Sequence, residues 1–95
     1  MTTWLFTSMD SDRRERLISQ ISEGKLKAWL EVGGGDPYFG AWMYLVDLVL
    51  HREVGITHGD LADFCWRDEY AAGTSPRDAA RDALAGDDIG WLLGL

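Results

Sequence analysis

Within residues 11–23, the apolar side chains Leu17 and Ile18 stand four and three positions before Ile21, and the other positions are polar. This spacing predicts an amphipathic helix, because residues three and four apart share one face. Asp10 or Ser11 can cap the start of this helix, and Gly24 is a common stop residue. We therefore expect a helix over residues 11–23.

A longer apolar stripe follows over residues 37–53. Asp36 and Pro37 are a strong start signal, since an acid that can cap a helix precedes a proline at the first helical position. Basic residues stand near the far end, where the helix dipole favours them, and Gly55 is a suitable stop. The pattern predicts the longest helix of the chain here.

Two more helices are predicted over residues 58–72 and 76–85. Thr57 with Asp60 resembles a capping box at the start of the first, and Pro76 opens the second. The last helix would present small apolar residues to its neighbours, and small side chains allow helices to approach closely. These residues are Ala79, Ala80, Ala83 and Leu84.

Two other segments have the pattern of strands. Residues 2–7 are aromatic and β-branched, and residues 25–32 alternate between apolar and polar positions. The glycines that bracket the second segment favour a strand, although the same residues can also extend the preceding helix. Residues 89–94 can supply a third strand. We expect an α+β fold, with a small two- or three-stranded sheet and about four helices, and an all-α bundle is the alternative.

The 95 residues are enough for a single domain, residues 1–95, and their charge is unevenly distributed. Residues 1–35 hold five acids and five bases, so the predicted β-α-β-like part is neutral. The formal net charge of −7 therefore lies entirely in residues 36–95, which form an acidic three-helix part with an apolar tail. The single cysteine cannot form an internal disulfide, and no secretory leader or membrane-spanning run is recognisable. These features favour the cytoplasm of a host cell.

An acidic surface repels the phosphate backbone, so direct binding to nucleic acid through this part is not expected. The carboxylates have two interpretations: they keep the protein soluble, or they dock on a basic surface of another protein. The candidate partner-binding residues are Asp60, Asp63, Asp68, Glu69, Asp78 and Asp82. Five tryptophans fall in five predicted elements, which indicates a shared aromatic core or, for one or two of them, an exposed interface anchor.

The pattern Asp-Leu-x-Asp-x-x-x-Arg-Asp-x-Tyr-x-x-Gly-x-x-Pro runs from Asp60 to Pro76. With its flanks, from Trp42 to Leu84, this part of the chain resembles a family of short uncharacterised helical proteins encoded by phages and their bacterial hosts. Ala62 stands where such sequences often have proline. The resemblance implies a three-helix module and a mobile-element setting. It implies no activity.

Candidate chemistry is sparse. His51, His58 and Cys65 are spaced by seven residues, and His58 and Cys65 on one helix would lie about 10 Å apart, too far for a catalytic hydrogen bond. A zinc site would need a fourth ligand, and Cys65 fits better as a small buried apolar residue. The triple glycine at 33–35 lacks the lysine of a phosphate loop and fits a flexible connector. We therefore expect no catalytic residues, no metal and no cofactor.

These observations favour a protein that acts by binding rather than by catalysis. We expect a non-enzymatic phage accessory protein that binds and modulates or inhibits a bacterial protein with a basic surface, as an anti-CRISPR or other anti-defence protein does. Neither direct nucleic-acid binding nor a membrane is expected. The alternative is a self-associating structural or assembly module of a phage particle, for which a homodimer is possible.

Overall fold

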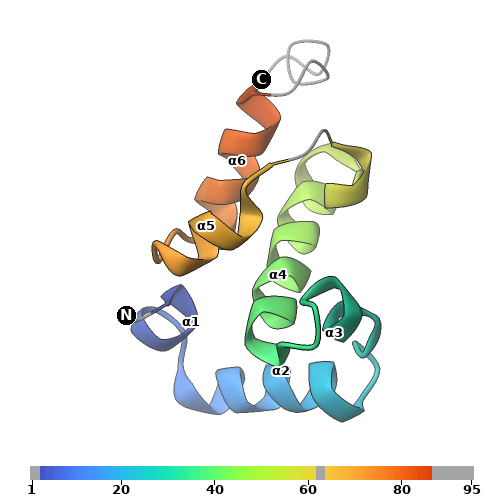
Figure 1. Ribbon diagram of the computed structural model, residues 1–95, viewed down its shortest axis with the longest axis vertical. Coiled ribbons are helices and arrows are strands. Elements are labelled where there is room, and N and C mark those ends of the chain that lie inside the picture. Colours follow the sequence, from blue (N-terminus) through green and yellow to red (C-terminus); the bar gives the residue numbers. More distant parts are fainter. Residues whose placement is uncertain (1–2, 62–63, 87–95) are drawn as a thin grey trace.

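A computed structural model describes residues 3–61 and 64–86, and every regular element in those ranges is helical (Figure 1). The predicted sheet is therefore wrong, and the all-α alternative describes this part of the chain. The elements are α1 (Trp4–Thr7), α2 (Ser11–Glu23), α3 (Ala28–Val32), α4 (Pro37–Val54), the 3₁₀ turn η1 (His58–Asp60), α5 (Trp66–Ala71) and α6 (Pro76–Gly86).

The 18-residue helix α4 is the centre of the fold. Helices α2 and α3 pack on its N-terminal half, α5 packs on it through few contacts, and α6 packs along it extensively (Figure 1). Asp36 caps α4 by accepting hydrogen bonds from the backbone of Tyr38 at 2.9 Å and Phe39 at 3.4 Å. Gly55 ends the helix in the left-handed conformation, with φ of 73°. Both boundary signals seen in the sequence are thus confirmed.

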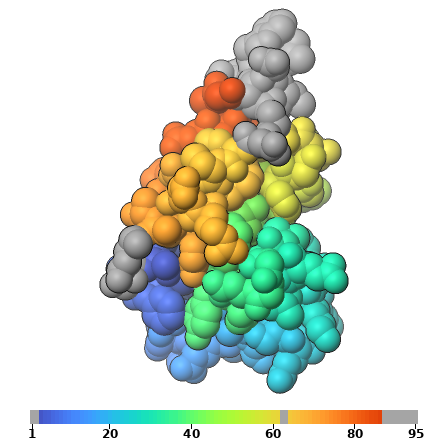
Figure 2. All heavy atoms as spheres, in the orientation of Figure 1, coloured from blue at the N-terminus to red at the C-terminus, as the bar shows by residue number. Residues whose placement is uncertain are grey.

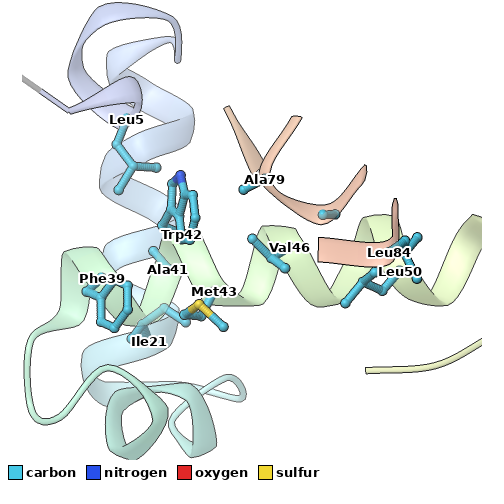
Figure 3. Packing of buried hydrophobic residues seen from close by; sticks show 11 residues of the cluster. Leu5, Ile21, Phe39, Ala41, Trp42, Met43, Val46, Leu50, Ala79 and Leu84 are labelled. Atoms are coloured by element: carbon cyan, nitrogen blue, oxygen red, sulfur yellow. The ribbon is translucent and has the colours of Figure 1, made fainter. Parts of the chain in front are cut away.

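Trp42 lies at the middle of the core and is completely buried (Figure 3). Its indole nitrogen donates a hydrogen bond to the carbonyl oxygen of Thr74 at 3.0 Å, in the turn between α5 and α6. Trp66 and Tyr70 of α5 meet the same indole edge-on, at centroid distances of 6.4 and 5.8 Å. The rest of the core comes from α1, α2, α4 and α6: Leu5, Ile21, Phe39, Ala41, Met43, Val46, Leu50, Ala79, Ala80 and Leu84.

The segment predicted as a first strand, residues 2–7, contains one helical turn, α1, while residue 2 lies outside the described ranges. Leu5 is its one fully buried side chain, and the neighbouring Phe6 is 48% exposed. A short segment that buries a single side chain gains little from a strand, which would also need a partner for its backbone hydrogen bonds. In the helical turn, the amide of Ser8 donates to the carbonyl of Trp4 instead.

The second predicted strand, residues 25–32, is a turn followed by α3. Its alternating pattern was misleading, because the residues packed against the core are Leu26, Trp29 and Leu30. Spacings of three and four place such residues on one side of a helical turn, whereas a strand would direct Trp29 and Leu30 to opposite faces. The third predicted strand, 89–94, lies outside the described residues.

The triple glycine forms a tight reversal between α3 and α4 rather than a loose connector. Gly34 and Gly35 have φ of 65° and 91°, and the amide of Gly35 donates to the carbonyl of Leu30 at 2.9 Å. Gly33 lies so close to α4 that a Cβ atom there would come within 2.5 Å of the backbone nitrogen of Gly40. These glycines let α3 fold directly against the start of α4.

The predicted helices over 11–23, 37–53 and 76–85 are confirmed, with ends at Glu23, Val54 and Gly86. The predicted helix 58–72 is divided in two. The capping box forms, since the Asp60 carboxylate accepts from the Thr57 amide at 3.0 Å, but η1 ends after one turn. Leu61 is extended, with ψ of 158°, so the helix does not continue.

Candidate functional site

The acidic residues predicted to bind a partner are distributed over three elements. Asp60 is in η1, Asp68 and Glu69 are in the first turn of α5, and Asp78 and Asp82 are on α6. Glu69 is partly buried, and the other four are exposed. Asp63 lies outside the described residues. Both α5 and α6 pack on α4, and in Figure 2 α5 (orange) crosses the middle of the visible face with α6 (red) above it.

Several of these carboxylates also stabilise helix starts. Asp60 closes the capping box of η1, and Asp68 and Asp78 stand in the first turns of α5 and α6. A carboxylate there interacts favourably with the helix dipole, by about 0.3–1 kcal/mol when exposed. Asp82, in the middle of α6, has no such role. Helix stability therefore explains part of the negative charge of residues 36–95. Among these carboxylates, it does not explain the presence of Asp82.

Two arginines among these acids are engaged within the fold. A guanidinium nitrogen of Arg81 contacts the carboxylate of Glu53 at 3.2 Å and ties α6 to the end of α4. The guanidinium of Arg67 lies over the ring of Phe39, 4.4 Å from its centroid, and donates to the carbonyl of Gly33 at 3.3 Å. Within the described residues, Arg67 contacts a ring and a carbonyl and makes no ion pair with a carboxylate.

A buried carboxylate that the sequence pattern did not predict, Asp47, lies on α4. Asp47 is 6% exposed and accepts hydrogen bonds from two elements. The indole nitrogen of Trp29 in α3 donates to Oδ2 at 2.8 Å, and the backbone amide of His58 in η1 donates to Oδ1 at 2.8 Å. The imidazole Nδ1 of His58 lies 2.8 Å from Oδ1 and 3.0 Å from Oδ2. One carboxylate thus joins α3, α4 and η1.

The surroundings shift both pKa values of this pair in the directions that favour a charged pair. Burial raises the pKa of Asp47, but the hydrogen bonds from His58 and Trp29 together outweigh burial and leave the pKa below its ordinary value. The hydrogen bond to Asp47 raises the pKa of His58 above its ordinary value, although burial opposes this. The side chain of His58 is 27% exposed. The cluster therefore favours an imidazolium held by a carboxylate.

An acid flanked by Val46 and Leu48 in an apolar helix is a sequence signal that a buried polar partner exists. The identity of the partners is not readable from the pattern, because Trp29 is 18 residues before Asp47 and His58 is 11 residues after it. In the sequence, His58 stands out only through its spacing from His51 and Cys65, which suggests a catalytic or metal-binding set.

The set His51, His58 and Cys65 does not form a metal site in the described part of the chain, where no group of three potential ligands comes together. His51 is exposed near the end of α4, and the imidazole of His58 is bound to Asp47. Cys65 directly precedes α5 and is exposed, so its interpretation as a buried apolar residue is wrong. Of the helices described, none is long and apolar enough to cross a bilayer.

Comparison of the chain with protein-family models, with curated proteins and with solved structures finds no match. The resemblance to small phage-encoded helical proteins therefore stays a prediction that depends on the motif between Asp60 and Pro76.

Proposed function

We propose that this chain is a binding protein without enzymatic activity, which docks on a basic surface of another protein through the acidic side chains of α5, α6 and η1. The observation that carries the proposal is the exposure of Asp68, Asp78 and Asp82 on two helices joined by a four-residue turn. Carboxylates at a protein interface attract Lys and Arg and give an association rate that depends on salt.

The core supports a binding role because it gives α5 and α6 a fixed relative position. Both helices meet at Trp42: α5 through the rings of Trp66 and Tyr70, and the turn before α6 through the carbonyl of Thr74. A surface held in this way loses little conformational entropy on binding.

The motif shared with phage-encoded proteins suggests the biological setting. In this proposal the chain is a phage accessory protein, and its partner is a bacterial protein whose basic groove normally holds nucleic acid. A defence nuclease or a CRISPR complex has such a groove. Occupation of the groove by carboxylates would exclude the phosphate backbone and inhibit the partner.

The test begins with affinity capture from a bacterial lysate and identification of the captured protein by mass spectrometry. The partner's dissociation constant is then measured between 50 and 300 mM NaCl, a range chosen around physiological ionic strength (about 150 mM). We expect the double variant Asp78→Lys, Asp82→Lys to bind at least about tenfold more weakly and with a smaller salt dependence. A triple variant that also carries Asp68→Lys should bind still more weakly.

The matched control is Glu31→Lys, which reverses an exposed carboxylate on α3 in the neutral half. It should leave affinity and salt dependence unchanged. Unaltered binding by the α6 double variant, with its helical circular dichroism intact, would show that these carboxylates do not form the docking surface.

A second candidate is self-association, as in a structural module of a phage particle. It is favoured by large apolar side chains that remain exposed within the described residues: Phe6 at 48% and Val32, Tyr38 and Leu48 at 37% each. Light scattering at protein concentrations from micromolar to millimolar separates the two candidates. A mass that stays that of a monomer throughout argues against self-association.

A further inference from the structure

A second feature of the surface lies away from the acidic helices, between α2 and the first turn of α4. It is a groove of about 310 Å³ along one side of α2, and α2 forms the lower edge of the molecule in Figure 1. Its lining includes Arg14, Glu15, Ile18, Ser22, Glu23 and Tyr38.

One aromatic ring, that of Tyr38, lines this groove, and the ring of Phe6 lies against it. Tyr38 is 37% exposed, and its ring centroid lies 5.3 Å from that of Phe6, which is 48% exposed. The guanidinium of Arg14 lies over Phe6, 4.6 Å from the centroid, and donates to the carbonyl of Leu5 at 3.3 Å. Exposed aromatic side chains of this kind are enriched in the energetic centres of protein interfaces. Because Arg14 already has these two partners, its charge is directed into the fold.

The opposite wall carries two carboxylates, Glu15 and Glu23. They are eight residues apart on α2, which places them about 12 Å apart along the axis. Both are exposed, and the ion pairs found within the described ranges involve neither of them. Glu23 is the last residue of α2, where the helix dipole disfavours a negative charge. Helix stability therefore gives no reason for an acid at this position.

We propose that this groove binds a lysine or arginine side chain of a partner protein. The aliphatic stem would pack on Ile18 and on the face of Tyr38, and the cationic group would lie between the carboxylates of Glu15 and Glu23. This arrangement matches the two parts of such a side chain, an apolar stem and a charged end. The inference rests on the proposed function in that it assumes the same basic partner, but it assigns a second contact to it.

The experiment is a nuclear magnetic resonance titration of the isotope-labelled protein with a short acetylated peptide that carries two lysines and two leucines. We expect saturable shifts of the backbone amides of Ser19, Ser22 and Tyr38. The variants Glu23→Lys and Tyr38→Ala should each raise the dissociation constant by roughly five- to tenfold. A peptide with serines in place of leucines should bind more weakly, because it has no apolar side chains to pack on Ile18 and Tyr38.

The controls separate this proposal from the previous one. Asp82→Lys on α6 should leave the groove shifts unchanged, and Glu23→Lys should keep the thermal stability, since it replaces an acid at the unfavourable end of a helix. Shifts confined to α5 and α6 would overturn the groove and leave the acidic docking surface standing. Shifts confined to the groove would support the groove, and the acidic docking surface is tested separately by the salt dependence of partner binding. A concentration-dependent dimer that Tyr38→Ala abolishes would also overturn the proposal, because a second copy would then fill the groove.

Discussion

At the scale of single residues, the carboxylate of Asp47 is held by hydrogen bonds from two other elements. It accepts from the indole of Trp29 and from both the backbone and the ring of His58, all at 2.8 to 3.0 Å. A buried carboxylate is costly unless such donors compensate for the lost water, and the donors are equally costly without the carboxylate. The stability of η1 and of the contact between α3 and α4 therefore depends on one ionisation state.

This arrangement predicts a stability maximum between about pH 4 and pH 6.5 from this cluster. Burial raises the pKa of Asp47, but the hydrogen bonds lower it overall, so its contribution is present above about pH 4 and is lost as the pH falls through the lowered pKa. The hydrogen bond to Asp47 raises the pKa of His58, so its contribution is complete below about pH 6.5 and is lost as the pH rises through the raised pKa. Urea unfolding across this pH range measures both effects.

Asp47→Asn provides the comparison for this prediction. Asparagine keeps the size of the side chain but removes the charge, so the free energy of unfolding should fall by about 1–3 kcal/mol. The free energy of unfolding should also vary less with pH above about pH 6. An Asn variant with the wild-type profile would show that the charged pair does not contribute.

At the scale of elements, the sequence signals for the ends of the longer helices were reliable. The sequence patterns of the two shortest helices, which predicted strands, were not. Asp36, Pro37 and Gly55 act within a few residues of the helix that they delimit, so the sequence alone contains the relevant interactions. Helices α1 and α3 have 4 and 5 residues, too few for periodicity to decide, and their conformation is set by the side chains that reach the core. The contacts of Asp47 with Trp29 and His58 were not predicted either, because these residues come together only in the folded chain.

The close approach of α3 and α4 gives a prediction at this scale. In Gly33→Ala the new methyl group would come within 2.5 Å of the carbonyl oxygen of Asp36 and the amide nitrogen of Gly40, both backbone atoms that cannot rotate away. We expect a loss of about 1–3 kcal/mol in the free energy of unfolding, measured by chemical denaturation.

Gly59→Ala is the matched control for this substitution. A methyl group there would meet only the hydroxyl of Thr57 at 3.7 Å, an ordinary van der Waals distance. Its stability should stay within about 0.5 kcal/mol of the wild type. Equal effects of the two substitutions would contradict a cost set by the contact between α3 and α4.

At the scale of the whole molecule, α4 connects an electrically neutral end to an acidic end. Helices α2, α3 and α6 all pack on α4. The uneven charge was evident from the sequence. The sequence did not show that the helices of the neutral part and those of the acidic part pack on the same central helix. The proposed docking surface and the proposed groove therefore lie on different elements but share the same support.

This common support predicts a single cooperative unfolding transition. Trp42 has no exposed surface and contacts α5 and the turn before α6, so Trp42→Ala should cost about 3–5 kcal/mol and destabilise both ends together. Tryptophan fluorescence and far-ultraviolet circular dichroism should give coincident denaturation curves in the wild-type protein. Two separated transitions would contradict the central role of α4 and would assign the two ends to independent units.

The position of Cys65 has a practical consequence. It is the one cysteine of the chain, it is exposed, and it directly precedes the helix that carries Asp68 and Glu69. A maleimide-linked photo-crosslinker can therefore be attached at one defined point beside the acidic helices, without any engineered residue. Irradiation in a lysate would then covalently trap a neighbour even when its residence time is too short for purification, and the trapped peptide would reveal which face of that neighbour had been in contact.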